Sequence, residues 1–331
     1  MAQDLHYVLE GLAMGGIKRV ASASQPPLHL LTAVSARKDA GGSPTGVVGQ
    51  GLARRLLDAG DRVRVLAEPG QVDGWPDGVE VVEGSITRPL EHAGVFDGVD
   101  GVFLAGAVPA TVGDALMAAR DAGVRRIVVL SSHGPEYEEA YPPDTWFWLA
   151  IERAVERSGM EWTHIRPSAV MGSVIEGTYP ATGSDWPDTV RGERIVREAF
   201  LEDGHYPFIH EDDLAAVAVA ALRTGDHAGT VVEAVGLPIS TRSRVASIAA
   251  AIGHDIAAVE MIPDDSRANR RRRGWPDGGI DVTLYALREY GARLAELTQW
   301  TLDQRPSVRE IIGRPLRGFD DWAVENAHLF R

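Results

Sequence analysis

Residues 45–51 read Thr45-Gly46-Val47-Val48-Gly49-Gln50-Gly51, and a helix-like stretch follows over residues 52–60. Glycines at this spacing let the backbone approach a pyrophosphate closely, and the N–H groups at the start of the following helix stabilise its charge. The stretch therefore predicts a dinucleotide-binding loop, and it indicates the fold more directly than any other part of the chain.

The predicted loop is separated from its strand. The nearest apolar strand covers residues 28–34, and the ten residues 35–44 stand between it and Thr45. A loop of this kind normally follows its strand directly. Because of the insertion, one alternative is that the chain keeps the fold but no longer binds the cofactor.

From residue 28 onward, short β-branched runs alternate with alanine-rich helical stretches. This alternation is typical of βαβ units around a parallel sheet. The predicted strands cover residues 28–34, 62–67, 79–83, 101–105, 126–131 and 162–166. The predicted helices cover residues 52–60, 112–122, 212–222 and 243–252. The sequence thus predicts an α/β fold with a doubly wound parallel sheet.

Three segments of the chain differ in pattern. We interpret residues 1–27 as an N-terminal extension without a function, residues 28–230 as the nucleotide-binding domain, and residues 231–331 as a smaller C-terminal substrate or cap region. Gly, Pro and Thr crowd residues 172–192 and predict a lid-like insertion over about 172–205. Ligands of open α/β sheets bind at the carboxyl ends of the strands, where such a lid would lie.

Composition excludes several classes of function. The formal net charge of −14 repels polyphosphate, which excludes broad nucleic-acid binding, and the basic tetrad Arg270–Arg273 is interpreted as a solvated loop. Cysteine is absent, so no disulfide or cysteine metal site can form. No apolar run approaches the roughly 18 residues of a membrane span, and residues 1–27 lack a signal-peptide core. We therefore expect a cytoplasmic protein that acts on a small molecule without membrane contact. The sequence leaves open whether the protein forms a homo-oligomer.

Several longer motifs occur together and in order. They cover residues 45–49, 78–84, 98–104, 122–132, 151–155, 158–167, 208–215 and 312–323. From about residue 42 to the C-terminus, this series resembles the NmrA-like branch of the atypical short-chain dehydrogenase/reductase superfamily. The resemblance implies an NAD(P)-binding Rossmann fold with a smaller C-terminal substrate-binding region.

The resemblance also implies which residues hold the dinucleotide. They are Thr45, Gly46, Val47, Val48, Gly49, Glu68, Ser85, Ala105, Gly106, Ser131 and Pro167. In the family's loop a first glycine stands where this chain has Ser43, and the next position is Pro44. Proline lacks an N–H group, and serine does not share the backbone freedom of glycine. The loop is therefore expected to offer one pyrophosphate donor fewer than its relatives.

Glu68 bears on the choice between the two dinucleotides. A carboxylate at the end of the second strand suits the two ribose hydroxyls and repels a 2′-phosphate. The expected cofactor is NAD(P)H, with NAD favoured over NADP. Arg62 and Arg64 lie nearby in the sequence and argue the other way. A solvated turn acid before Pro69 is the alternative interpretation of Glu68.

The usual catalytic pair of the wider superfamily is missing. Those reductases use Tyr-x-x-x-Lys, in which the lysine lowers the pKa of the tyrosine. Lysine occurs here only at Lys18 and Lys38. The polar groups left near the expected nicotinamide are Ser132 and His133, with Tyr141 as a third candidate. His133 is of a type that can donate a proton near neutral pH, and a purely structural histidine is the alternative.

Two tryptophans form the predicted substrate site. Trp146 and Trp148 flank Phe147, and their rings predict a pocket wall for a flat substrate. Core or lid packing is the alternative. Arg166 is expected to pair with a carboxylate inside the fold.

No metal site is predicted. His205, His210, Asp212 and Asp213 lie close together but lack the spacing of a known metal centre. His210 is interpreted as a packing residue and Asp213 as a helix cap.

Three functions remain open. The preferred one is an oxidoreductase that passes hydride from NAD(P)H to a small conjugated carbonyl or quinone-like acceptor. Backbone N–H groups, Ser132 or water would stabilise the resulting enolate or quinol charge. The second is a non-catalytic dinucleotide sensor resembling NmrA regulators, which the missing catalytic pair favours. The third is a relic fold that binds no cofactor, which the loop insertion favours.

Overall fold

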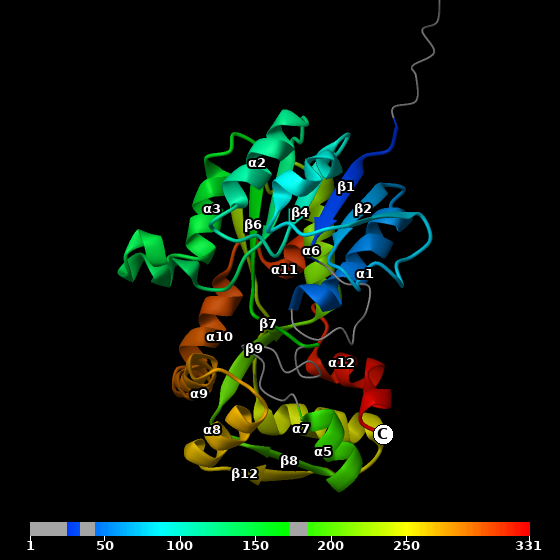
Figure 1. The fold of residues 1–331 in the computed structure, drawn as a ribbon. Coiled ribbons are helices and arrows are strands. Elements are labelled where there is room, and N and C mark those ends of the chain that lie inside the picture. The colour runs from blue at the N-terminus through cyan, green and yellow to red at the C-terminus, as the bar shows by residue number, and fades with distance from the viewer. Residues whose placement is uncertain (1–24, 34–43, 173–184) are drawn as a thin grey trace, which may run out of the picture.

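The computed structural model describes residues 25–33, 44–172 and 185–331. Its centre is a seven-stranded sheet in the order β3-β2-β1-β4-β5-β6-β10 (Figure 1). The strands are β1 Leu28–Thr32, β2 Arg62–Ala67, β3 Val79–Glu83, β4 Gly101–Leu104, β5 Arg126–Leu130, β6 Glu161–Pro167 and β10 Thr230–Ala234. Every neighbouring pair is parallel. The predicted α/β fold with a parallel sheet is confirmed.

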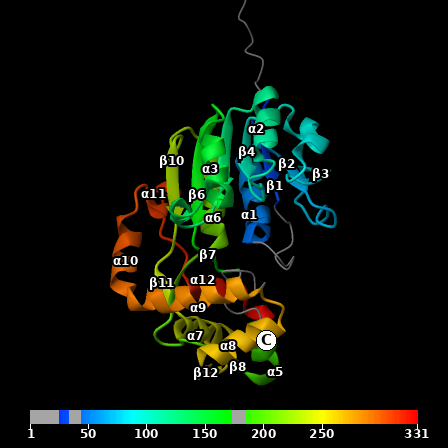
Figure 2. The same cartoon turned by 60° about the vertical axis from the view of Figure 1, so that its left-hand side comes forward.

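Helices cover both faces of this sheet (Figure 2). The helices α1 Pro44–Asp58 and α6 Glu211–Arg223 pack on one face, and η1 Pro89–Phe96, α2 Val112–Asp121 and α3 Trp148–Glu156 pack on the other. Successive residues of a strand point to opposite faces, so the sheet feeds two separate cores. Leu31 belongs to the first core and Leu30 to the second. Burial on both faces explains why all five residues of β1 are buried.

The order of the strands defines where a ligand can bind. The chain runs from β1 outward to β3, then returns to the centre at β4 and continues outward through β5 and β6 to β10. The direction of winding therefore reverses between β1 and β4. In open α/β sheets this reversal opens a crevice at the carboxyl ends of the strands.

A second region lies beyond those carboxyl ends (Figure 1). It holds a three-stranded sheet of β7 Ala169–Val170, β9 His205–Ile209 and β11 Pro238–Ser240, and a two-stranded sheet of β8 Ile195–Glu198 and β12 Ala257–Glu260. Its helices are α5 Trp186–Glu193, α7 Thr241–Ile252, α8 Pro263–Arg272, α9 Asp277–Ala292, α10 Leu294–Asp303 and α12 Phe319–Glu325. The short helix α11 Val308–Ile312 packs instead against α6 and β10 of the central sheet. Trp186, Phe208 and Trp322 are buried in its core.

The start of the first helix differs from the prediction. α1 begins at Pro44, so Thr45–Gly51 lie inside the helix and do not form a loop before it. A β-carbon on Gly51 would stand 3.4 Å from Asp212 Oδ1 and 3.7 Å from Ala215 Cβ of α6. This glycine therefore lets the two helices pack closely. Residues 35–43 of the insertion, residues 1–24 and residues 173–184 of the predicted lid lie outside the described residues.

The interpretation of Arg270–Arg273 as a solvated loop is wrong. Residues 270–272 form the last turn of α8, and Arg270 is buried with Nη2 2.8 Å from Glu198 Oε1. A run of charge indicates polarity but not exposure, because a buried cation is stable when a carboxylate pairs with it.

The helix cap predicted at Asp213 is wrong, whereas His210 is buried, as expected of a packing residue, and also supplies the cap. His210 is the N-cap of α6, because its Nδ1 accepts a hydrogen bond from the Asp212 N–H at 3.1 Å. Asp213 is fully buried, accepts from the Arg317 N–H at 2.7 Å and pairs with Arg314 at 2.6 Å. Asp213 thus fastens the segment after α11 to α6, while an imidazole supplies the cap.

Within the described ranges, no helix is long and apolar enough to cross a membrane.

Candidate active site

At the crevice, the side chain of Thr32 links the end of β1 to the residue after β4. Thr32, the last residue of β1, donates from Oγ1 to the Ala105 carbonyl at 2.7 Å and accepts from the Ala105 N–H at 2.9 Å. The next residue, Gly106, has φ +71, and a β-carbon there would stand 2.3 Å from Ala33 Cβ. The predicted residues Ala105 and Gly106 therefore lie where the two strand ends approach most closely, and only glycine fits the second position.

The topology places the start of α1 at the same edge. A helix that links two parallel strands runs back across the sheet, so its N-terminus lies at the carboxyl ends of the strands. The backbone of Thr45–Gly49 forms the first turns of α1. Its N–H groups are therefore at the edge where a pyrophosphate binds in this topology. The residues present fit a dinucleotide here, although the side chains of residues 44–47 lie outside the description.

Two further predicted contacts follow neighbouring strands. Glu68 comes directly after β2 and is half-buried, with its carbonyl accepting from the Gln71 N–H at 2.9 Å. Ser85 comes after β3, is buried, and shares a 2.8 Å hydrogen bond with the Thr87 hydroxyl. The strand order sets both residues along the carboxyl edge on the β2 side of the crevice.

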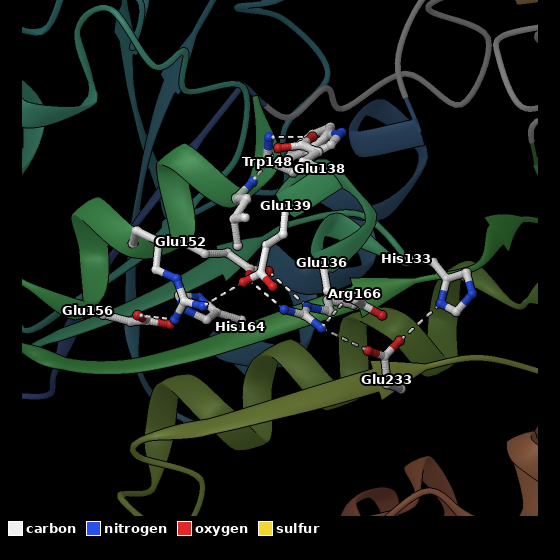
Figure 3. Close-up of polar contacts among 12 residues, drawn as sticks. His133, Glu136, Glu138, Glu139, Trp148, Glu152, Glu156, His164, Arg166 and Glu233 are labelled. Atoms are coloured by element: carbon white, nitrogen blue, oxygen red, sulfur yellow. Dashed lines mark hydrogen bonds and ion pairs between the residues drawn. The ribbon is translucent and has the colours of Figure 1, made fainter. Parts of the chain in front are cut away.

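On the other side of the crevice, a buried ionic network surrounds Arg166 of β6 (Figure 3). Its guanidinium donates to Glu152 at 3.0 and 2.7 Å, to Glu136 at 2.9 Å and to Glu233 at 3.3 Å. The expected carboxylate partner of Arg166 is confirmed. Burial opposes the charge of Arg166, but the three carboxylates outweigh it and raise the pKa of the guanidinium.

Glu152 of α3 is the most deeply buried acid of this network, with 1% of its side chain exposed. Burial alone would raise the pKa of its carboxyl, but the hydrogen bonds from Arg166 reverse the effect and the pKa is lowered. The pair therefore stays charged in the interior. It holds the end of β6 against α3.

His133 joins this network through Glu233 of β10. His133 Nδ1 lies 3.1 Å from Glu233 Oε2, and 21% of the His133 side chain is exposed. The imidazole also meets the Trp300 ring edge-on, with 5.1 Å between the ring centroids. A carboxylate only accepts hydrogen bonds, so Nδ1 is assigned as the donor and Nε2 is the nitrogen left for another partner.

His164 and Glu156 extend the network away from the crevice. His164 of β6 is buried, stacks on Trp162 at 4.4 Å, and places Nε2 3.5 Å from Glu156. Burial lowers the pKa of His164 more than Glu152 and Glu156 raise it. We therefore assign the neutral form to His164, as a structural member of the network.

The predicted substrate tryptophans lie near the start of α3. The Glu138 carboxylate accepts from the backbone N–H groups of Phe147, Trp148 and Leu149 at 2.9 to 3.1 Å and so caps the helix. Trp148 is partly buried against the core of that face. Trp146 is half-buried and donates from Nε1 to the Tyr141 carbonyl at 3.0 Å, while Tyr141 is 66% exposed.

A cavity of about 1050 Å³ adjoins the network. It lies between the β10–β11 segment and the chain from α10 to α12, and Glu233 is one of its lining residues. Glu233, whose carboxylate binds His133, is therefore shared between the network and the cavity wall.

Sequence reasoning missed Glu233, Glu136 and the strand β10 itself. The signal for Glu233 was present, since an acid at the fourth place of the apolar run Thr230–Ala234 needs a partner if that run is a buried strand. Two predicted residues lie beside this network: Ser131 directly follows β5, and Pro167 ends β6.

Comparison with known proteins identifies the chain's relatives. A family model described as NAD(P)H-binding matches residues 44–224. The chain belongs to this NAD(P)H-binding family. A relative from Streptomyces griseus, (4-alkanoyl-5-oxo-2,5-dihydrofuran-3-yl)methyl phosphate reductase, is 32% identical over 86% of this chain and 96% of its own length.

One further relative agrees on the family, and one solved structure agrees on the fold. NAD(P)H azoreductase from Xenophilus azovorans is 27% identical over 86% of this chain and 96% of its own length. The triphenylmethane reductase of Citrobacter sp., solved with NADP(H), has a TM-score of 0.64 and 18% identity, covering 91% of this chain and 99% of that one. The family is one of NAD(P)H-dependent reductases with a Rossmann-like sheet. The narrower NmrA-like assignment stays a prediction.

Proposed function

We propose that this chain reduces small conjugated carbonyl or quinone-like compounds with NAD(P)H, and that the substrate enters the cavity beside β10. The observation that carries the proposal is His133, bound to Glu233 at 3.1 Å at the edge of the cavity that Glu233 lines. A candidate proton donor thus contacts a residue that lines a space large enough for a small molecule.

The dinucleotide would lie across the carboxyl ends of β1 and β4. The backbone of Thr45–Gly49 would face its pyrophosphate, Ala105 and Gly106 would border the crevice, and Ser131 and Pro167 would border its nicotinamide. When bound, the nicotinamide supplies the hydride that the substrate accepts. Every other step uses groups of the chain.

NAD is proposed as the preferred form. Glu68 follows β2 directly and would meet the ribose hydroxyls. The two arginines that argued for NADP are engaged elsewhere: Arg64 donates to the carbonyls of Val95 and Asp97, and Arg62 begins β2 at the opposite edge of the sheet. Among the described residues, Glu68 is therefore the charged group that follows β2.

His133 would complete the reduction by donating a proton. In the protonated form, Nδ1–H binds Glu233, and Nε2–H is free to protonate the oxygen on which negative charge develops. Glu233 stabilises the imidazolium and fixes the ring, and Arg166 holds Glu233 from its other oxygen. Ser132, next to His133, is the proposed second donor to that oxygen. Tyr141 stays a predicted third donor, and its side chain is largely exposed.

The relatives support the reaction class. The name of the Streptomyces griseus relative describes an unsaturated lactone that carries an acyl group, and the second relative is named for azo compounds. Both are electron-poor conjugated systems, to which hydride adds without a tyrosine–lysine pair. Trp146 and Trp148 are not among the residues that line the cavity, and Trp148 packs against the core, so their substrate role stays a prediction.

The test is oxidation of NADH by a panel of quinones, unsaturated lactones and azo dyes, followed by loss of nicotinamide absorbance. His133→Ala is expected to lower kcat about 10²- to 10⁴-fold, the usual share of a general acid. His254→Ala is the matched control, since His254 is an exposed histidine after α7. Equal rates for both variants would remove His133 from catalysis. Binding of NADH without oxidation by any member of the panel would replace the reductase by a dinucleotide sensor.

A further inference from the structure

The cavity beside β10 is more positive than the chain around it. Its charged lining consists of Arg305, Arg309, Arg314, Arg317, Glu233 and Glu310. Four arginines thus face two glutamates on a chain whose formal net charge is −14. A cleft lined mainly by one sign of charge concentrates ligands of the opposite sign.

Two of these arginines are already paired. Arg314 binds Asp213 at 2.6 Å, and Arg317 binds Glu325 at 2.6 Å and Asp212 at 3.1 Å. These pairs fasten the lining segment to α6 and α12. They leave one unsatisfied donor, because Arg314 Nη2 is buried without a hydrogen-bond partner.

The other two arginines keep most of their donors. Arg305 donates from Nη1 to the carbonyls of Leu302 and Gln304 at 2.9 and 2.6 Å, which fixes its position, and stands 3.7 Å from Glu310. Glu310 is itself engaged by the Ser307 N–H at 2.8 Å. Within the ranges that the structure describes, no ion pair of Arg309 is found. A guanidinium has five donors in a fork that suits carboxylate and phosphate oxygens.

The rest of the lining is largely apolar and partly uncovered. Leu237, after β10, is 56% exposed, and Leu302, at the end of α10, is 53% exposed. Val235 and Phe208 continue the apolar surface. Large aliphatic side chains that remain exposed in a cavity fit an aliphatic ligand, whose burial removes their surface from water.

We infer that the cavity binds a molecule with an anionic head, a phosphate monoester or a carboxylate, and an aliphatic tail. Arg309 and Arg305 hold the head, and Leu237 and Leu302 cover the tail. The inference rests on the proposed function, because the bound molecule is taken to be the compound that is reduced. Its conjugated part then lies toward Glu233 and His133. Neutral quinones would be poorer ligands of the same cavity.

Calorimetric titration of the full chain tests this with four probes: n-octyl phosphate, octanoate, 1-octanol and inorganic phosphate. At least one of the two anionic chains should bind about tenfold or more tightly than 1-octanol and than inorganic phosphate. The stronger of the two identifies the head as phosphate or carboxylate. Arg309→Gln should weaken that binding about tenfold, with the Kd for NADH unchanged. Arg120→Gln on α2, another exposed arginine, is the matched control.

A second variant separates the tail from the head. Leu237→Ser should weaken binding of the octyl anions and leave inorganic phosphate unchanged. The inference is overturned if 1-octanol binds as tightly as both anions, or if Arg309→Gln and Arg120→Gln bind alike. These results are independent of turnover. Oxidation of NADH by neutral quinones can persist when the inference fails, and the octyl anions can bind when the reductase proposal fails.

Discussion

The two edges of the parallel sheet each hold a histidine paired with a carboxylate, but in opposite settings. At the amino edge, His29 of β1 lies 3.3 Å from Asp61, and 3% of its side chain is exposed. At the carboxyl edge, His133 lies 3.1 Å from Glu233, and 21% of its side chain is exposed. The cavity beside the first has a volume of about 120 Å³, and the cavity beside the second about 1050 Å³.

The charged side chains near His29 at the amino edge are also bonded to one another or to the backbone. Arg223 donates to Asp61 at 2.7 Å, and Arg126 donates to Glu161 and to the Leu222 carbonyl at 2.6 and 2.7 Å. These bonds tie strand starts to the end of α6. A histidine–carboxylate pair therefore indicates function only where a nitrogen of the ring remains accessible beside room for a ligand. We therefore assign a structural role to the histidine pair at the amino edge, in contrast to the catalytic role proposed for the pair at the carboxyl edge.

The contrast between the two edges depends most on Arg166, which stabilises the buried charge of the carboxyl edge. Arg166→Met should lower the free energy of unfolding by about 3–5 kcal/mol, because it leaves Glu152 charged and unpaired in the interior. Chemical denaturation at neutral pH measures the loss.

The double variant Arg166→Met with Glu152→Gln should recover part of that stability, since it removes both charges. If the double variant is no more stable than the single one, the unpaired Glu152 charge is not the cause of the loss.

The free energy of unfolding should depend on pH through His29 at the amino edge. Burial lowers the pKa of His29 below its ordinary value of 6.5, and Asp61 offsets this only in part. The unfolded chain therefore binds more protons than the folded chain just below pH 6.5, so the stabilisation is present above that pH and is lost as the pH falls. The free energy of unfolding should fall by at most about 1.4 kcal/mol per pH unit for this histidine.

His29→Asn should flatten this pH dependence and leave kcat of the folded protein unchanged. His164, whose pKa burial also lowers, contributes the same sign and remains in this variant. A fall in kcat for His29→Asn matching that of His133→Ala would show that the two edges do not differ in function.

At the crevice, Glu68→Arg should shift the preference toward NADPH, with about tenfold tighter binding of that form. The reason is replacement of a carboxylate that repels a 2′-phosphate by a guanidinium that binds it. Glu83→Arg, at the end of β3, serves as a control for added charge. Equal NADPH affinity in the wild type and in Glu68→Arg would place Glu68 outside the ribose site.

The smallest expected effect lies at Ala33. This residue has φ +47, a region that costs a non-glycine residue about 1 kcal/mol or more. Ala33→Gly should raise the free energy of unfolding by up to about 1 kcal/mol, reduced by the greater entropy of glycine in the unfolded chain. Thermal unfolding measures the change, and a loss of stability would show that Ala33 is not strained.

Much of the fold could be predicted because the strands from β1 to β6 are short apolar runs separated by helical periods. Strand β10 escaped prediction because Glu233 interrupts its apolar pattern, and the acid is tolerated only through Arg166 and His133, which lie far away in the sequence. The start of α1 was missed because Gly46 and Gly49 are typical of loops. In the structure they lie inside a helix, where neighbouring Gly51 allows close contact with α6.

The site could be predicted only in part for the same reason. His133 follows β5 and Arg166 lies near the end of β6, so both are visible in the sequence, whereas Glu233 and the cavity depend on contacts between distant segments. The arginines between residues 305 and 317 carry no local signal for a ligand. Their common placement around one cavity follows from the return of α11 to β10 and α6.

The central claim, that the carboxyl edge binds a nicotinamide dinucleotide, is tested most directly by titrating the full chain with NADH and with NADPH and following nicotinamide fluorescence. We expect saturable binding of both, tighter for NADH, because Glu68 follows β2 and the N-terminus of α1 lies at the carboxyl ends of the strands. Absence of saturable binding for either dinucleotide would contradict the claim and would leave a member of the family that keeps the sheet without its cofactor.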